Sequence, residues 1–78
     1  MSTFERLVEV FNTVFEDEIN VASVTPESTL QEDIGITSIG LLYMVMALEE
    51  EFEIKFTNED FVGIKTVGDV ARCIDAKL

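Results

Sequence analysis

Ser38 is the residue of this chain that is best placed for chemistry. It lies where a turn-rich segment, residues 33–37, meets an apolar helical pattern at residues 39–46. A serine at a helix N-terminus lies among backbone N–H groups without helical partners and at the positive end of the helix dipole. A phosphate attached to its hydroxyl would be stabilised there. The position therefore suits a phosphoester.

The other reactive side chains do not form a catalytic set. The chain has no histidine and one cysteine, Cys73, so it offers no Ser-His or Cys-His pair, no internal disulfide and no cysteine-based metal cluster. Its carboxylates occur in runs such as 16–18 and 49–51, which are typical of exposed helix faces, and they lack the spacing of a calcium loop. We therefore expect no enzymatic activity, no metal site and a partly buried, structural Cys73.

Composition limits the classes of partner. The chain has 78 residues, which predicts one domain over residues 1–78, and its five basic and sixteen acidic residues give a net charge of −11. This charge repels nucleic acid and attracts basic protein surfaces. No segment approaches the roughly 20 apolar residues of a membrane span, and no secretory signal follows the first Met. We expect a cytoplasmic monomer that does not bind nucleic acid.

Capping patterns and helical spacing predict an all-α fold. Serine or threonine stands three residues before an acidic residue at Ser2, Thr57 and Thr66, which is the spacing of a helix cap. The first of these caps precedes a core-facing pattern of Phe4, Leu7, Val8, Phe11, Val14 and Phe15. The last precedes Val67, Val70, Ala71, Ile74 and Leu78. The middle one predicts a short helix that ends at Gly63.

Residues 20–37 hold the only proline and many turn-forming residues, so they are predicted to be a long loop with a turn at 25–27. Its apolar residues, Leu30, Ile34 and Ile36, should attach it to the core. The prediction is a small four-helix bundle of three main helices and one short helix, with this loop between the first two.

The helix after Ser38 has two apolar stripes. Leu41, Met44, Val45, Leu48 and Phe52 form one, and Ile39, Leu42, Tyr43 and Met46 form the other. A domain of this size can hardly bury both, so we expect the second stripe to be an exposed docking surface. The alternative is a fully buried central helix.

These motifs together resemble the acyl carrier protein family over nearly the whole chain. The resemblance is carried by the Asp-x-Gly loop at 33–35, by Ser38, by Leu-Glu-Glu-Glu-Phe at 48–52, and by the segments 25–30 and 66–70. In that family the serine carries 4'-phosphopantetheine, which is transferred from coenzyme A and holds acyl groups as thioesters. The resemblance implies that Ser38 is the attachment residue. The residues flanking it that a modifying enzyme would recognise are Asp33, Gly35, Ile36, Thr37 and Ile39.

Two flanking residues depart from the family pattern, because Thr37 stands where Asp is usual and Ile39 where Leu is usual. A threonine can still cap the helix, although it lacks the carboxylate. Carrier proteins of fatty acid synthesis commonly have acidic residues early in this helix, where this chain has Gly40 and Tyr43 instead. We therefore expect partners to bind mainly by apolar contact, with Gly40 allowing close approach. The docking residues predicted are Leu42, Tyr43, Met46, Glu49 and Glu50.

The resemblance implies that the partners are a phosphopantetheinyl transferase and acyl-loading, condensing or acyl-transfer enzymes. The leading prediction is a free-standing acyl carrier of a fatty-acid or specialised acyl or polyketide pathway. One alternative is an aminoacyl or peptidyl carrier of a nonribosomal pathway. Another is an unmodified helical interaction module in which Ser38 is only a helix cap.

Overall fold

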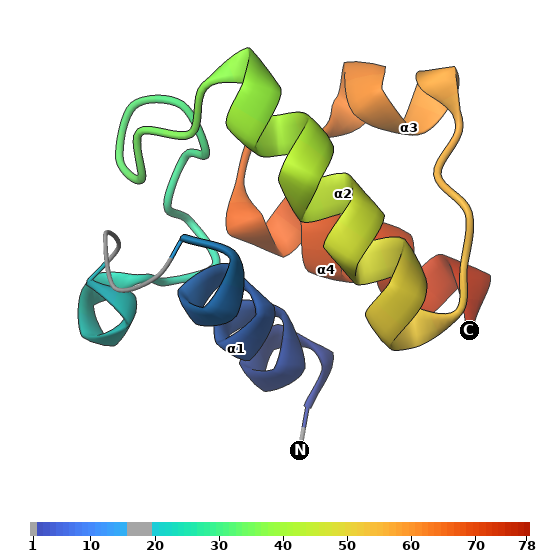
Figure 1. Ribbon diagram of the computed structural model, residues 1–78, viewed down its shortest axis with the longest axis horizontal. Helices are drawn as coiled ribbons and strands as arrows, with labels where there is room; N and C mark the ends of the chain where they lie inside the picture. Colours follow the sequence, from blue (N-terminus) through green and yellow to red (C-terminus); the bar gives the residue numbers. More distant parts are fainter. Residues whose placement is uncertain (1, 16–19) are drawn as a thin grey trace.

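The computed structural model describes residues 2–15 and 20–78. These ranges contain helices and loops, with the order that the sequence predicts (Figure 1). The elements are α1 (Thr3–Phe15), the 3₁₀ helix η1 (Val21–Ser23), α2 (Ser38–Phe52), α3 (Asn58–Gly63) and α4 (Val67–Lys77). The all-α prediction, with one short helix among three longer ones, is confirmed. The predicted loop additionally contains η1, which the sequence patterns do not indicate.

The predicted caps begin three of the helices. At α1, the Ser2 hydroxyl accepts a hydrogen bond from the Glu5 N–H at 3.1 Å, and the Glu5 carboxylate accepts one from the Ser2 N–H at 3.0 Å. The same reciprocal pairs form at α3 and α4, between Thr57 and Asp60 and between Thr66 and Asp69. Each pair satisfies two N–H groups that the helix itself leaves without partners.

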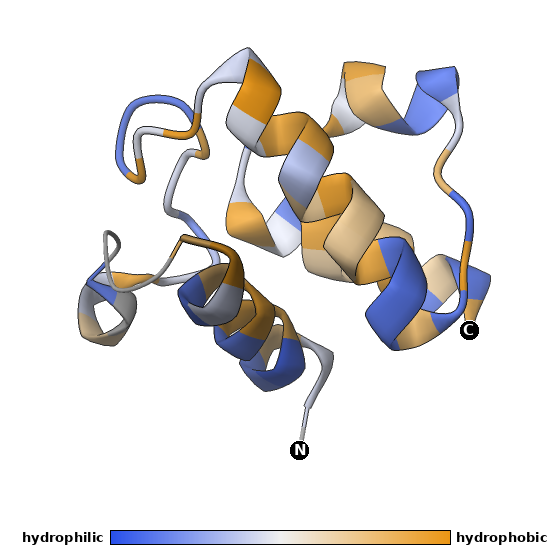
Figure 2. Cartoon of the chain, in the orientation of Figure 1, coloured by the Kyte–Doolittle hydropathy of each residue, from blue (hydrophilic) through white to orange (hydrophobic). Residues whose placement is uncertain are grey.

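The core lies where α1 packs against both α2 and α4 (Figure 1). The side chains without exposed surface are Leu7 and Phe11 from α1, Met44 and Leu48 from α2, and Val67, Val70 and Ile74 from α4. Figure 2 shows the apolar character of α2 over most of its length and a hydrophilic C-terminal end. The predicted core stripe of α2 is therefore confirmed, with Leu41 half-buried against the core.

Two details of the predicted core are wrong. Val10 of α1 packs against the core, whereas Val8 and Val14 are half-buried but outside the core cluster, so the buried face of α1 is turned toward Val10 relative to the predicted stripe. Leu78 follows the end of α4 and is 67% exposed, so it does not continue the stripe.

The long loop is attached to the start of α4. The Leu30 N–H donates to the Lys65 carbonyl at 3.0 Å, and Thr29 and Thr66 form an isolated antiparallel bridge. The Gly68 N–H donates to the Pro26 carbonyl at 2.8 Å, and a Cβ at Gly68 would lie 2.9 Å from that oxygen. Only glycine allows this approach, which holds the loop in a fixed position before α2 begins.

In the part of the chain that the structure describes, no helix is long and apolar enough to cross a membrane.

Candidate functional site

Ser38 is the first residue of α2, and Thr37 is its cap. Thr37 has an extended backbone, and its hydroxyl accepts a hydrogen bond from the Gly40 N–H at 3.1 Å. Ser38 is exposed, and its hydroxyl makes no hydrogen bond to the described residues. The alternative that Ser38 serves as the helix cap is therefore wrong. Thr37 caps the helix instead and leaves the Ser38 hydroxyl available at the helix N-terminus.

The loop before Ser38 is held by its own side chains. The Asp33 carboxylate accepts a hydrogen bond from the Thr29 N–H at 2.8 Å, and the Thr29 hydroxyl accepts one from the Asp33 N–H at 2.9 Å. Gly35 follows with a φ of 84°, a conformation that favours glycine. Asp33 and Gly35 thus have a structural role that explains their place in the motif.

Ile36 does not contribute a side chain to the surface. It is 6% exposed, and its N–H donates to the Leu30 carbonyl at 2.7 Å. This burial confirms the expectation that Ile36 attaches the loop to the core, whereas its role as a flanking recognition residue, which the burial does not favour, stays a prediction. Its neighbour Thr37 is exposed, and so is Ile39 on the other side of Ser38.

Gly40 is explained by packing within the chain. A Cβ at this position would lie 3.3 Å from the Phe15 ring and 3.3 Å from the Ile36 side chain. The glycine therefore lets the first turn of α2 lie close to the end of α1 and to the loop. Gly40 thus has a packing role, and its expected role in close approach by a partner stays a prediction.

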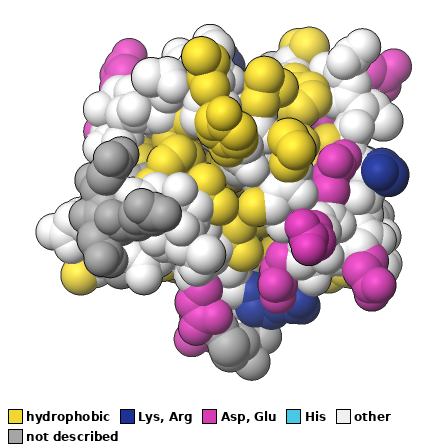
Figure 3. Space-filling model, in the orientation of Figure 1, with side chains coloured by type: hydrophobic (Ala, Val, Ile, Leu, Met, Phe, Trp, Pro, Cys, Tyr) yellow, Lys and Arg dark blue, Asp and Glu magenta, His cyan; other side chains and the backbone are white. Residues whose placement is uncertain are grey.

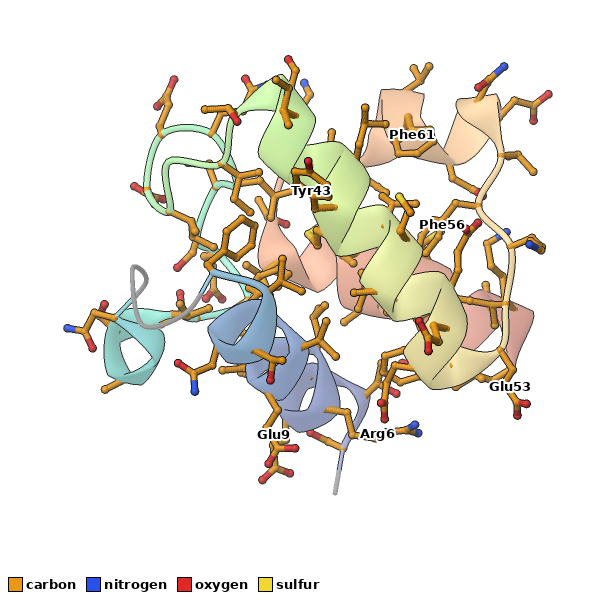
Figure 4. All side chains as sticks on the ribbon, viewed as in Figure 1. Arg6, Glu9, Tyr43, Glu53, Phe56 and Phe61 are labelled. Atoms are coloured by element: carbon orange, nitrogen blue, oxygen red, sulfur yellow. The ribbon has the colours of Figure 1, made fainter. Side chains whose placement is uncertain are left out.

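The second apolar stripe of α2 is exposed, as predicted. Ile39, Leu42, Tyr43 and Met46 expose between 59% and 65% of their surface. Figure 3 shows apolar side chains gathered over α2 and toward α3, and Tyr43 projects outward from α2 in Figure 4. Val62 of α3 is 82% exposed and was not predicted, because a six-residue helix is too short for its spacing to assign a face. The docking role of this surface stays a prediction.

The acidic end of α2 is partly used within the fold. The Glu49 carboxylate accepts a hydrogen bond from the Phe56 N–H at 2.8 Å, in a partly buried position. Glu51 pairs with Arg6 of α1 at 3.0 Å, and the Arg6 guanidinium lies 4.3 Å from the centre of the Phe52 ring. Glu49 thus has a structural role, and its docking role stays a prediction. Glu50 remains exposed.

Cys73 lies beside an ion pair that joins α3 to α4. The Lys77 ammonium is 2.9 Å from the Asp60 carboxylate, and this contact lowers the pKa of Asp60 to about 2. Partial burial, with Asp60 nearby, raises the pKa of the Cys73 thiol. A raised thiol pKa disfavours the reactive thiolate. Cys73 is half-buried, and its expected structural role agrees with this environment.

Comparisons with known proteins agree with this arrangement. The family model for the phosphopantetheine attachment site matches residues 5–74. The acyl carrier protein of Clostridium perfringens (strain 13 / Type A) is 43% identical over 74 residues, which cover 91% of each chain. The sequences from two further strains, SM101 and ATCC 13124, match to the same extent.

Solved structures show the same fold. The solution structure of the holo acyl carrier protein from Geobacter metallireducens superimposes with a TM-score of 0.84 at 30% identity, and the match covers 99% of this chain and 86% of that one. A structure from Mycobacterium tuberculosis also gives a TM-score of 0.84, at 27% identity, and covers 96% of this chain and 97% of that one. The chain therefore belongs to the acyl carrier protein family, whose members bear phosphopantetheine and are carriers rather than enzymes.

Proposed function

We propose that Ser38 is the residue that receives 4'-phosphopantetheine and that the chain is a free-standing carrier of acyl thioesters. The observation that supports this proposal is that two neighbouring residues at the start of α2 have different roles. Thr37 caps the helix, and the exposed Ser38 hydroxyl beside it is free of hydrogen bonds to the described residues. The helix dipole favours a phosphate at this position.

The attachment is a phosphoryl transfer from coenzyme A. The Ser38 hydroxyl oxygen attacks the phosphorus that bears the pantetheine arm, and a new P–O bond forms. The P–O bond to adenosine 3',5'-bisphosphate breaks, and the serine proton passes to a base of the transferase. The fixed loop and the Thr37 cap hold the oxygen in place before the transferase binds, which lowers the ordering cost of the encounter.

The exposed stripe of Ile39, Leu42, Tyr43 and Met46 is the proposed docking surface for partner enzymes. It begins next to Ser38, so an enzyme that binds it holds the tethered thioester close to its own active site. The tether then acts by raising effective concentration. The partners proposed are the phosphopantetheinyl transferase and acyl-loading, condensing or acyl-transfer enzymes, with Glu50 as an acidic contact at the far end.

The acyl form of the carrier is favoured over an aminoacyl or peptidyl one by the strong net acidity and by the relatives described above. We assign it to a fatty-acid or specialised acyl or polyketide pathway and to the cytoplasm, as a monomer. The apolar character of the stripe favours dedicated partners, because apolar contacts replace most of the charge-based recognition that acidic residues would provide.

The experiment that tests this proposal is intact-mass analysis after reaction with coenzyme A and a broad-specificity phosphopantetheinyl transferase. The wild-type protein should gain the mass of one phosphopantetheine group, and Ser38→Ala should gain none. Ser23→Ala, which removes another exposed serine hydroxyl, should react like the wild type. Modification of Ser38→Ala would show that another residue is the attachment site.

A further inference from the structure

A groove of about 450 Å³ lies between α1 and the C-terminal half of α2. Its lining on α1 extends from Arg6 to Val14, an axial length of about 12 Å, or roughly two helical turns. Its lining on α2 begins at Ala47, about 13.5 Å along the helix axis from Ser38. The groove is therefore separate from the proposed attachment site, and it is not lined by the exposed apolar stripe of α2.

The floor of this groove is apolar. It is formed by Val10 and Val14 from α1 and by Ala47 from α2, and all three are half-buried. Val14 lies outside the core cluster, so its remaining apolar surface is not used by the fold. Ala47 has a small side chain, which permits close approach by another segment. Two neighbouring helices with apolar side chains between them form a surface on which a third helix can pack.

The edges of the groove are acidic. Glu9 lies on α1 and Glu50 on α2, and both are exposed. Arg6 and Glu51 pair with each other at 3.0 Å, so together they add no net charge. Neither Glu9 nor Glu50 forms an ion pair with a described residue, and Glu9 projects outward from α1 (Figure 4). The groove therefore has one unpaired negative charge on each edge.

We propose that this groove binds a basic amphipathic helix of a partner protein. A helix of about two turns fits its length. The apolar stripe of that helix covers Val10, Val14 and Ala47, and Lys or Arg residues on its two flanks pair with Glu9 and Glu50. This arrangement is recognition of a helix in a groove, with an apolar centre and a charged edge. A second copy of this chain is disfavoured as the occupant, because each copy has a net charge of −11.

The position of the groove gives this contact a consequence for the carrier. A partner bound there leaves Ser38 and the stripe at residues 39–46 exposed, so a second protein can use them at the same time. Glu50 is the one predicted docking residue that also lines the groove. Binding in the groove uses the folded chain alone, so it does not depend on whether Ser38 is the attachment residue.

The test uses the full chain before modification and a synthetic helical peptide of about 14 residues, in which a leucine stripe is flanked by lysines. Fluorescence anisotropy gives the Kd, and NMR chemical-shift changes of the ¹⁵N-labelled protein locate the bound peptide. We expect the shift changes to concentrate at residues 6–14 and 47–51 and the affinity to fall as salt is added. A peptide of the same composition without the leucine stripe should bind at least about fivefold more weakly.

Two pairs of variants locate the contact. Glu9→Lys should weaken binding about fivefold, whereas Glu59→Lys, which changes the net charge equally but lies on α3, should change it less than about twofold. Val14→Ser should weaken binding about threefold, because it removes part of the apolar floor. Val62→Ser, at an 82% exposed side chain of α3, should preserve it. Circular dichroism verifies the fold of each variant.

Three results would overturn the inference. The first is the absence of binding, or shift changes centred on residues 39–46. The second is equal weakening by Glu9→Lys and Glu59→Lys, which would assign the binding to net charge alone. The third is a shift of the groove resonances with protein concentration in the absence of peptide, which would make a second copy the occupant.

A transferase reaction with saturating peptide tests whether the two surfaces work at the same time. The initial rate of Ser38 modification should stay within about twofold of the rate without peptide, since the groove lies about 13.5 Å or more along α2 from the serine. Strong inhibition would contradict simultaneous use. If no group is added even without peptide, the proposed attachment fails, whereas the groove inference is still decided by the binding measurements.

Discussion

At the N-terminal end of α2 the exposed residues are apolar, and the Ser38 hydroxyl faces solvent. At the C-terminal end three glutamates follow one another, and two of them, Glu49 and Glu51, bind other parts of the chain. Glu49 holds the segment that leads to α3, and Glu51 holds α1 through Arg6. One helix therefore joins an end that is available to partners with an end that fixes its position. The difference shows that exposed apolar residues and fold-stabilising charges can be separated along a single helix.

The largest effect on stability should come from the buried side of α2. Leu48 has no exposed surface, so Leu48→Ala should lower the free energy of unfolding by about 2–5 kcal/mol. Leu42→Ser and Met46→Ser, on the exposed side, should change it by less than about 1 kcal/mol and should slow turnover by partner enzymes much more. Denaturant unfolding and a transferase assay measure the two effects.

If Leu42→Ser and Met46→Ser destabilise the fold as much as Leu48→Ala, the exposed stripe is part of the core and not a docking surface. If they leave turnover unchanged, the stripe is exposed but is not the surface that the transferase binds.

Substitutions of Glu49 and Glu50 test the structural role of the C-terminal end of α2. Glu49→Ala should cost about 1 kcal/mol, because the Phe56 N–H loses a charged acceptor in a partly buried position. Glu50→Ala is the matched control, since Glu50 is exposed, and its effect should be within about 0.5 kcal/mol. Chemical denaturation of both variants gives the comparison. Equal effects would remove the distinction between a structural and a free carboxylate.

Substitutions of Thr37 test the role of the helix cap at the N-terminal end of α2. Thr37→Ala should lower stability by about 1 kcal/mol, because the Gly40 N–H loses its partner. Thr37→Asp should preserve the cap and accelerate modification of Ser38 by a transferase that recognises Asp-Ser-Leu, since it places an anion near the helix N-terminus. Thermal melting and the initial rate of modification measure these effects. Equal modification rates for Thr37→Asp and the wild type would show that the threonine does not limit recognition.

The smallest expected effect is the pH response of α3. The ion pair with Lys77 lowers the pKa of Asp60 from 3.8 to about 2, so its stabilising contribution is present above about pH 4 and is lost as the pH falls toward 2. Amide protection factors in α3, which correct for the intrinsic pH dependence of exchange, should fall over this range in the wild type. Asp60→Asn should lack this step, and Glu59→Gln on the same helix should retain it. A step that persists in Asp60→Asn would assign the response to other carboxylates.

The parts of the fold that the sequence predicts depend on local patterns. The three capping pairs involve residues three apart, and the stripes of α2 follow from helical spacing alone. The single domain over residues 1–78 and the monomeric state, both expected from the sequence, remain predictions. The parts that it misses depend on contacts between distant segments. The need for glycine at position 40 comes from close packing against Phe15 and Ile36. The structural role of Glu49 comes from its hydrogen bond with the Phe56 N–H, seven residues further along the chain.

The same distinction applies to the site. The junction at Ser38 is predictable because a loop motif, a cap and a helix adjoin in the sequence. The expectation that Ile36 attaches the loop to the core is confirmed by its burial, whereas the hydrogen bonds that join the loop to the start of α4 could not be predicted from spacing along the chain. A cavity lined by Leu30, Leu41 and Ile64 was likewise not predicted, since its lining comes from three separate segments.

The most direct test of the central claim is tandem mass spectrometry of the protein after reaction with coenzyme A and the transferase, with fragmentation that locates the added group. The phosphopantetheine mass should be found on Ser38 alone, at the exposed end of α2. Its presence on any other serine or threonine, including Thr37, would contradict the assignment of that end as the functional one.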